Sequence, residues 1–502
     1  MNMRNKLIIS AIFAITTFSS CLDLNPISEI GEDSFFKNDS EIEIGVTACY
    51  NGLQEPIINE WMLTDIRSDV SRAYDKSSST VEIKNIMALN ELEAFASIQE
   101  IEAYWNSVYN NIYRCNLVLK NINNVSDETK RKQFEGEARF IRAYHYFNLV
   151  RLFGPVFLVK ETITPQEAFS YERTAVETVY SFIEEDLKTI IDGNLLPVSY
   201  ESDKDLGRVT MLSARTLLGK VYLTLKKYDE AQIQLKEVEK AYNGYDLSSI
   251  EYKDVFSTTN EMNKEIIFAV RFKSGNVGLG NPFGNMFGPQ TSGTSVIVGS
   301  GSSFNYPSKK LTDSYKENDK RKDATIALGY TDNQNGQYKD IRYVTKYLSP
   351  VVTAEDGEND VPVLRYADVL LMLAEIENEL NGATPAAFDY LNATVKRAGL
   401  QPYTSSELTN KVDFRLAVEN ERYLEFAYEN QRFFDLIRTD RFKDVMTQYY
   451  KTEIYDKDGG SKFYYEDNAN LFNGIIDERQ LLLPLPTSLI DVNPNITQNP
   501  GY

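Results

Sequence analysis

Hydrophobic and polar positions along this chain follow mostly the period of an α-helix. The longest such pattern runs from Gly136 to Pro155, where apolar or aromatic residues cover most faces of the predicted helix. A helix with so little polar surface has to be buried on more than one side. Gly154 can adopt the left-handed conformation that ends helices, and Pro155 cannot continue one. We therefore expect a buried helix that stops at Gly154 and organises the surrounding fold.

Other helical patterns surround this one. They cover about residues 39–53, with an interruption at Pro56, and about residues 98–121. A helix ending near Ile191 is predicted to begin with a capping box formed by Thr174 and Glu177. The final segment has closely spaced prolines and is expected to lie extended against the body. The chain is therefore expected to be mainly α-helical.

Two of the helical segments share an internal spacing that is typical of tetratricopeptide repeats. In both, small or apolar residues are separated by twelve and then by seven positions: Gly219, Ala231 and Val238, and again Ala374, Ala386 and Ala393. Small residues at such positions let two antiparallel helices approach closely. The repetition predicts a tetratricopeptide-like helical-repeat scaffold, with long irregular loop excursions and a few short strands.

A different pattern interrupts the scaffold at about residues 265–361. Strand-like stretches at 266–272 and 341–347 flank a run rich in Gly, Ser, Asn and Pro. Such a length without helical periodicity favours a functional excursion. The glycines match neither of the spacings that bind phosphate groups. Aromatic rings in such loops can stack on the apolar faces of sugars, which makes candidates of four residues: Phe283, Phe287, Phe304 and Tyr306.

An earlier segment, residues 61–80, also mixes aromatic with polar residues and is predicted to be a loop. Trp61 and Tyr74 are candidates for ligand stacking, and three neighbours are candidates for hydrogen bonds to the ligand: Arg67, Asp69 and Arg72. The alternative for each of these aromatic residues is packing in the core. Trp105 lies within a helical pattern and is assigned to the core.

The N-terminus has the features of an export signal. Arg4 and Lys6 precede an uncharged run that is too short to span a bilayer. Ser19 and Ser20 stand directly before Cys21, which resembles a bacterial lipobox and implies cleavage before Cys21 and diacylation of its thiol. The alternative is an ordinary secretory signal with a Cys near the cleavage site. Acyl chains on Cys21 would hold the protein on a membrane.

Composition limits the partners. The formal charge of −20 and the pI of about 4.8 exclude nucleic acid, because its binders need Lys and Arg to displace counterions. After removal of the signal only Cys49 and Cys115 remain as thiols, and their apolar helical surroundings predict buried thiols. A disulfide between them is the alternative.

Catalytic chemistry finds little support in the residues. His145 is the only histidine and lies on an apolar stripe, so it is expected to be a core or interface residue, and a Ser or Cys triad has no base available. The 73 acidic residues leave a glycosidase pair open. Acidic clusters at 355–358 and 456–458 could bind calcium, but neither matches an EF-hand, and solvated loops are the preferred interpretation. No cofactor is predicted.

Six segments follow one another in a fixed order along the chain: SCLDLNP at 20–26, YWNSVYNNIYRCN at 104–116, GEARFIRAYHYFNLVRLFGPVFLV at 136–159, LRYADVLLMLAE at 364–375, ENERYLEFAYENQRFFDLIR at 419–438 and LPLPTSLIDVNPNITQNPGY at 483–502. In this order they resemble the SusD/RagB family. Phe157 and Asp368 depart mildly from the family pattern, where Pro and Glu are frequent.

The resemblance implies a surface lipoprotein on the outer face of a bacterial outer membrane. Its helical side would pack against a TonB-dependent porin of the SusC type, and its loops would form a shallow, non-catalytic ligand site. Members most often bind glycans, although some serve peptides or other nutrients. Only regions can be carried over as ligand-binding: Trp61 to Tyr74 and Asn281 to Tyr306.

These expectations define an organisation. Residues 1–20 form the signal, 21–38 a tether and 39–502 one domain. Within it the scaffold covers 39–264 and 362–447, the ligand-side excursion 265–361 and an extended C-terminal segment 448–502. The expected function is capture of an oligosaccharide for import; the alternatives are a peptide or other nutrient, a surface glycoside hydrolase, or a scaffold that binds only protein.

Overall fold

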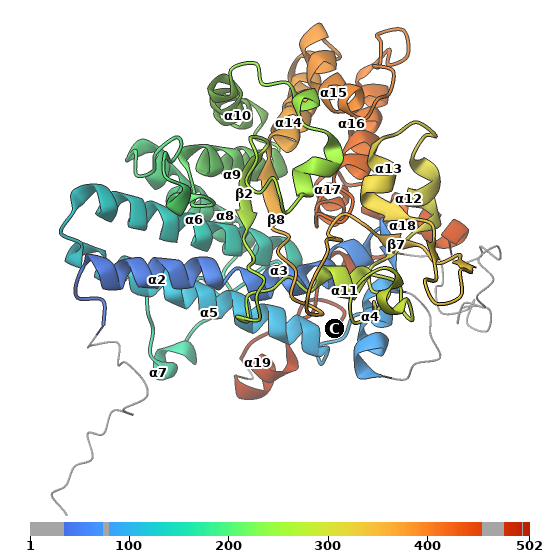
Figure 1. Cartoon of the computed structure of the whole chain (residues 1–502). Helices are drawn as coiled ribbons and strands as arrows, with labels where there is room; N and C mark the ends of the chain where they lie inside the picture. The colour runs from blue at the N-terminus through green and yellow to red at the C-terminus, as the bar shows by residue number, and fades with distance from the viewer. Residues whose placement is uncertain (1–34, 74–79, 454–475, 494) are drawn as a thin grey trace, which may run out of the picture.

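The computed structural model describes residues 35–73, 80–453, 476–493 and 495–502. This part of the chain is mainly α-helical, as predicted (Figure 1). The helices are α2 (Asp39–Asn51), α3 (Gln54–Leu63), α4 (Val81–Asn90), α5 (Gln99–Asn121), α6 (Glu128–Phe153), α7 (Pro165–Ala168), α8 (Val176–Asp192), α9 (Met211–Thr224), α10 (Tyr228–Tyr242), α11 (Phe283–Phe287), α12 (Lys309–Ser314), α13 (Arg321–Thr325), α14 (Tyr366–Asn381), α15 (Pro385–Arg397), α16 (Lys411–Glu425), α17 (Arg432–Arg438), α18 (Phe442–Glu453) and α19 (Thr487–Val492).

The strands of the described residues are short and form four antiparallel pairs. β1 pairs with β3, β2 with β8, β4 with β7 and β5 with β6. Their bounds are β1 (Ser71–Arg72), β2 (Ile266–Val270), β3 (Tyr306–Pro307), β4 (Ile326–Ala327), β5 (Tyr330–Thr331), β6 (Tyr338–Lys339), β7 (Tyr343–Val344) and β8 (Val361–Arg365). Because each sheet has only two strands, the sheets connect segments and do not form a layer of the core.

Helix α6 is the buried central element that its pattern predicts. The Asp127 side chain accepts hydrogen bonds from the first backbone N–H groups, so the helix begins eight residues before Gly136. Seventeen of its residues are buried, and it packs against α5 on one side and α8 on the other. Gly154 ends it at a φ of +70°, where a Cβ would lie 2.9 Å from a methyl group of Leu482. The chain therefore needs glycine at this position.

The remaining long helices pack on one another in succession. α8 packs on α9, α9 on α10, α10 on α14, and α14 on both α15 and α16. In Figure 1 these helices rise from the layer of α2, α5, α6 and α8 towards α15 at the top. Gly219 of α9 allows a close approach, since a Cβ there would lie 2.6 Å from Leu235 of α10. The helical-repeat scaffold is confirmed.

The repeat spacing predicts one of the buried positions incorrectly. Ala231 and Ala374 are buried, as the pattern requires, but Ala386 is exposed and Ala387 takes the buried position on α15. Thr384 is the N-cap of α15, and the helix direction set from there turns Ala387 towards its neighbours. Spacing alone does not fix the rotation of a helix about its axis, because 3.6 residues per turn leave an uncertainty of one position.

The chain leaves the helices at β2 and returns at β8, where Val270 is paired with Val361. Between these strands lie α11, β3, α12, α13 and the four strands β4 to β7, on the right-hand side of Figure 1. The segment is held at its base by the β2–β8 pair, and Tyr366 N–H donates to the Glu265 carbonyl at 2.8 Å. Its position relative to the scaffold is thus set by backbone hydrogen bonds.

Several local expectations are wrong. Trp61 lies in α3, because Pro56 falls in the first turn of that helix, where proline is tolerated. All residues from 61 to 72 are buried, so this stretch is not an exposed loop. Helix α8 begins after Ala175, which makes no side-chain cap, so Thr174 and Glu177 form no capping box. Helix α4 had no counterpart among the expected elements.

The C-terminal segment packs against the body as expected but is not wholly extended. Residues 478–481 form a short 3-10 helix, and α19 follows Pro486, since no proline interrupts residues 487–492. Leu483 N–H donates to the Leu152 carbonyl at 2.8 Å. The Asn499 side chain donates to the Phe153 carbonyl at 2.9 Å. The segment thereby covers the end of α6.

In the described ranges, none of the helices combines the length and the apolar character needed to cross a bilayer. The predicted export signal, the predicted lipidation residue Cys21 and most of the predicted tether lie outside the described residues, as do residues 454–475. Cys49 and Cys115 are free thiols at the α2–α5 contact, and both are buried, which confirms that prediction.

Candidate functional site

The two segments expected to bind ligand lie side by side. Strand β1 lies near the end of the first segment and pairs with β3 at the end of the second, so that Arg72 lies opposite Tyr306. The Arg72 guanidinium lies 5.3 Å from the centre of the Tyr306 ring. The Asn305 side chain donates to Asp65 at 3.3 Å. Residues more than 200 positions apart in the sequence therefore form one continuous region of the structure.

Beneath this region the predicted aromatic residues pack on one another. The Trp61 ring is 5.4 Å from Phe287 in an edge arrangement and 6.0 Å from Phe304 in a stacked one. Phe283 stacks on Phe287 at 4.7 Å. Trp61, Phe283, Phe287 and Tyr306 are all buried, and so in this structure they support the surface from below and do not present a ring to a ligand. The physical reason is that apolar rings in a glycine-rich segment gain more from mutual burial than from exposure.

The predicted polar residues of the first segment are also enclosed. Arg67 donates to the carbonyls of Leu63 and Gln480, and its guanidinium covers the Phe433 ring. Asp69 accepts from Arg432 and Lys310. Burial alone would raise the pKa of Asp69, but the nearby Arg432 and Lys310 lower it to about 2. Tyr74 lies outside the described residues.

Phe304 is the predicted aromatic residue that remains half-buried in the described structure. Its backbone is fixed because Phe304 N–H donates to the Met286 carbonyl and Ser302 N–H to the Asn285 carbonyl, both at 2.8 Å. It borders a small recess of about 10 Å³, formed by Ala73, Ile83 and Ile86 on one side and residues 302–305 on the other. Helix α4, absent from the sequence prediction, supplies one wall.

The backbone beside this recess is strained. Ser300, Ser303 and Asn305 all have a positive φ, at 71°, 56° and 51°. Such conformations cost free energy in residues other than glycine and cluster where a surface has a task. Asn285 holds the segment from below, since its amide donates to the carbonyls of Val298 and Ser300. The segment is therefore preorganised by internal hydrogen bonds.

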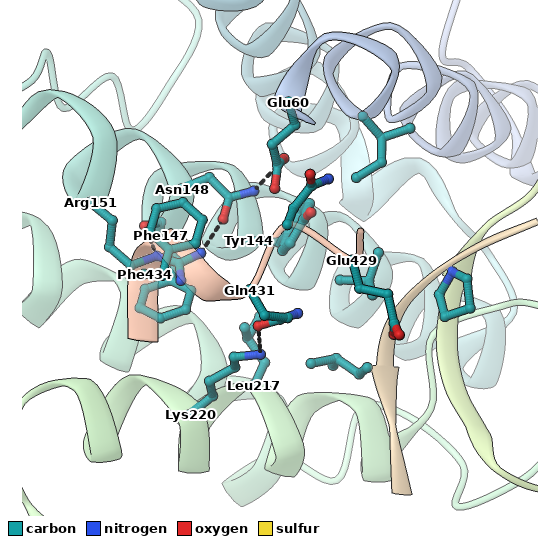
Figure 2. A pocket seen from close by; sticks show the side chains of 15 residues that line it. Glu60, Tyr144, Phe147, Asn148, Arg151, Leu217, Lys220, Glu429, Gln431 and Phe434 are labelled. Atoms are coloured by element: carbon teal, nitrogen blue, oxygen red, sulfur yellow. Dashed lines mark hydrogen bonds between the residues drawn. The ribbon is translucent and has the colours of Figure 1, made fainter. Parts of the chain in front are cut away.

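A second recess lies among α3, α6, α9, β8 and residues 429–434 (Figure 2). Its volume of about 30 Å³ has room for about two water-sized groups. A sugar ring is too large to enter it. Polar as well as apolar side chains line it. Glu60 accepts from the Asn148 amide at 3.2 Å, and Asn148 in turn accepts from Arg151.

The electrostatics of this second recess are unusual for a core. Burial raises the pKa of Glu60 to about 7, against the opposing effect of Arg151. The Arg151 guanidinium lies between two rings, 3.7 Å from the centre of Phe147 and 3.6 Å from that of Phe434. Charged residues on otherwise apolar helix faces are the sequence signal that would have pointed to Glu60 and Arg151.

Other candidates have structural roles. His145 is buried, and its Nε2 lies 2.8 Å from the Asn111 amide nitrogen, as expected for a core residue. Asp356 accepts from the N–H groups of Gly275 and Asn276, and Glu358 pairs with Lys273. The acidic cluster at 355–358 thus forms hydrogen bonds and an ion pair with the neighbouring loop at 273–276. The second cluster, 456–458, lies outside the described residues.

Comparison with known proteins relates this chain to one family along most of its length. The family model described as "SusD family" matches residues 325–502, and the one described as "Starch-binding associating with outer membrane" matches residues 22–223. The "SusD-like protein P25" of Formosa agariphila is 27% identical over 554 residues, with 100% of both chains covered.

Solved structures agree with the sequence comparison. A "Laminarin binding SusD-like protein" has a TM-score of 0.74 at 27% identity and covers 93% of this chain and 100% of its own. A SusD homologue from Bacteroides thetaiotaomicron has a TM-score of 0.79 at 22% identity, covering 94% of this chain and 98% of its own. At that identity the second likeness concerns the fold. The helical architecture described above is shared over nearly the whole chain.

Proposed function

Since the chain belongs to the SusD/RagB family, we propose that it is a surface lipoprotein that captures an oligosaccharide and passes it to a TonB-dependent outer-membrane transporter. Capture takes place on the face where β1 meets β3, beside α4 and residues 300–306. We name this face the ligand face.

One observation carries the proposal: two segments with the composition of ligand-binding loops are joined by the β1–β3 pair into a single preorganised region. Phe304 is half-buried there, beside Ser302, which is also partly exposed. A flat ring next to hydroxyl groups suits a sugar, which has an apolar face and polar edges. A rigid site also loses little conformational entropy on binding. The laminarin-binding relative supports a glycan as the ligand.

The proposed activity is binding without bond cleavage. A glycosidase needs two carboxyl groups that reach the glycosidic bond. The described carboxyl groups whose pKa burial raises to about 7 are Asp360, which is paired with Arg271 at 2.7 Å, and Glu60 and Asp65. Glu60 lies in the small recess of Figure 2 and Asp65 is buried beneath the ligand face. Neither is accessible to a glycosidic bond.

The cellular setting is part of the same proposal. Diacylation of Cys21 would anchor the chain to the outer membrane on its outer side, and the helical scaffold would pack against a SusC-like porin. Mass spectrometry of the protein from cell membranes tests the anchor through the mass of the N-terminal peptide. Co-purification of a porin with tagged protein tests the partner.

The ligand is tested by calorimetry of the soluble domain against a panel that includes laminarin oligosaccharides, other oligosaccharides and a peptide mixture. We expect saturable binding of at least one glycan class and no release of new reducing ends during long incubation. Binding of peptides without binding of any glycan would show that the ligand is a peptide and not an oligosaccharide. Release of reducing ends would identify a hydrolase and overturn the proposal of binding alone.

A further inference from the structure

The recess of Figure 2 has features that a merely structural cavity does not require. Its partly exposed mouth is formed by Arg151, Lys220, Val363 and Gln431, and Glu60 lies at the inner end. These residues come from helices α3, α6 and α9, from strand β8 and from the loop before α17. The recess is separate from the ligand face.

The charges around the recess are balanced with one exception. Glu429 accepts from Lys346 and Arg365, and Lys220 donates to Asp368 at 2.8 Å. Among the described residues Arg151 forms no ion pair within 4 Å; it donates to the Phe147 carbonyl and to Asn148. Arg151 and Glu60 are connected only through the Asn148 amide. Protonation of Glu60 would leave the charge of Arg151 without a counterion.

The groups that line the interior include donors beside the carboxyl groups of Glu60 and Glu429. The Gln431 carbonyl oxygen accepts from Lys220 Nζ at 2.6 Å, so its amide nitrogen points to the middle of the recess, as Figure 2 shows. The Tyr144 hydroxyl and the Arg151 guanidinium border the same space. Donors beside a guanidinium select an anion with several acceptor atoms, and a carboxylate matches the planar fork of arginine.

The loop that carries Gln431 is held in a strained conformation. Tyr428 and Asn430 have φ values of 65° and 58°. Contacts from other elements hold the loop in place: Lys346 donates to the Ala427 carbonyl at 2.7 Å, and Tyr347 donates to the Tyr428 carbonyl at 3.0 Å. A tyrosine in this conformation is an outlier, and strain of this kind is typical of binding sites. The strain in this loop is an observation independent of the charges around the recess.

We propose that this recess is a second binding site, for a small carboxylate anion of the size of formate or acetate. The anion would accept hydrogen bonds from Arg151 and from the Gln431 amide. Protonated Glu60 would donate to it from the inner end. The space of about 30 Å³ admits the carboxylate group and little more.

Proton uptake should accompany binding. Four residues on other elements influence the Glu60 carboxyl group, namely Arg151, Asp65, Tyr104 and Lys220. Tyr144 and Glu429 line the same recess. The pKa of Glu60 is about 7 because of its burial. Below pH 7 Glu60 is neutral and permits an anion; above pH 7 its negative charge opposes one. The affinity for the anion should therefore fall about tenfold for each pH unit above 7.

Saturation-transfer NMR at constant ionic strength, with sodium formate and sodium acetate, tests the proposal on the soluble domain. Gln431→Glu keeps the oxygen that accepts from Lys220 and replaces the donor with a negative charge, so we expect binding to weaken at least tenfold. Gln401→Glu makes the same change at an exposed position after α15 and should leave binding unchanged. Glu60→Gln should bind the anion with no dependence on pH between 6 and 9.

Three results would overturn the proposal. The first is the absence of saturable binding of either anion to the unaltered domain at pH 6. The second is equal affinity in the Gln431→Glu variant, whose folding circular dichroism verifies. The third is equal binding of methanol, which would show that the negative charge is not recognised. None of these results bears on glycan capture at the ligand face.

Discussion

The indole ring of Trp61 lies stacked on Phe304, with ring centres 6.0 Å apart and planes inclined by 22°. Trp61 is buried, whereas Phe304 is half-buried. The two residues come from segments more than 200 positions apart, and their contact fixes the position of the ring that borders the ligand face. Trp61 thus supports the ligand face without touching its surface.

Phe304 is predicted to stack on the bound glycan. Phe304→Leu removes the ring and keeps an apolar side chain of similar volume, so the domain should lose less than about 1.5 kcal/mol of stability. Loss of ring stacking should weaken glycan binding by about 1 kcal/mol, which is about fivefold in Kd. Calorimetry with the oligosaccharide that binds best measures this effect.

The matched control for that variant is Phe388→Leu. Phe388 is also half-buried, but it lies on α15 and packs against Phe414. The Phe388→Leu variant should leave glycan affinity unchanged. Equal affinities of the Phe304 and Phe388 variants would place the ligand elsewhere on the molecule.

Glu60 is predicted to make the protein less stable at alkaline than at acidic pH. Burial raises its pKa from the ordinary value of 4.5 to about 7. The folded protein holds this proton more tightly than the unfolded chain does. The contribution of protonated Glu60 to the free energy of unfolding is therefore complete below pH 4.5 and is lost as the pH rises to 7. One pKa unit corresponds to about 1.4 kcal/mol, so the loss is roughly 3 kcal/mol.

Urea unfolding of the Glu60→Gln variant at pH 5 and pH 8 measures this contribution. The amide is neutral at both values and can still accept from Asn148. The variant should be more stable than the unaltered protein at pH 8 and similar to it at pH 5. A variant that is less stable at pH 8 would contradict the account of Glu60.

Glu425 is predicted to stabilise the fold strongly through buried arginines. It accepts from Arg365 at 2.7 Å and from Arg321 at 3.3 Å, and it also accepts from Arg397. Glu425→Gln would leave these charges without full compensation and should cost about 3 to 5 kcal/mol in unfolding by urea. Glu128→Gln, which breaks an exposed pair with Lys132, should cost less than about 1 kcal/mol.

The ion pairs of the Glu425 carboxyl group also predict that the protein becomes less stable in acid. Burial would raise the pKa of Glu425, but Arg397, Arg365 and Arg321 lower it to about 2. Its stabilisation is therefore present above pH 4.5 and is lost as the pH falls from 4.5 to about 2. The stability difference between Glu425→Gln and the unaltered protein should shrink over that range. A difference that stays constant would contradict the ion-pair account.

Gly219 is predicted to be required by the contact between α9 and α10. Gly219→Val would place side-chain atoms against Leu235, where even a Cβ approaches to 2.6 Å, and overpacking of this kind costs about 1 to 3 kcal/mol. Leu235→Ala in the same chain should relieve the clash, so the two changes should be non-additive by at least about 0.5 kcal/mol. Additive effects would mean that the helices separate without contact at this point.

His145 is predicted to stay neutral in the folded protein. Its burial lowers its pKa to about 3, and it is the single histidine of the chain. The imidazole signals in proton NMR spectra should therefore not shift between pH 8 and pH 4.5. A titration with a midpoint near 6.5 would place His145 in contact with water.

The sequence was sufficient for the features that depend on local pattern. Helix α6 and its end at Gly154 follow from apolar periodicity and from the backbone freedom of glycine. The helical pairs follow from repeated spacing, although the spacing placed Ala386 where Ala387 is buried. The error of one position arises because the rotation of α15 depends on its N-cap and its neighbours.

The ligand face was less predictable, for a physical reason. Composition indicated the segments around Trp61 and Phe304, but an aromatic residue in such a segment can face a ligand or the core. Which of them is buried depends on contacts across more than 200 positions, such as the β1–β3 pair. Helix α4 and the strained residues Ser303 and Asn305 carried no distinct pattern in the sequence.

The central claim is that a glycan is captured, unbroken, on the ligand face. A crystal structure of the soluble domain with its best-binding oligosaccharide tests this most directly. We predict an intact oligosaccharide with a sugar ring against the exposed part of Phe304 on the ligand face. An oligosaccharide bound to another surface, or a cleaved one, would contradict the account.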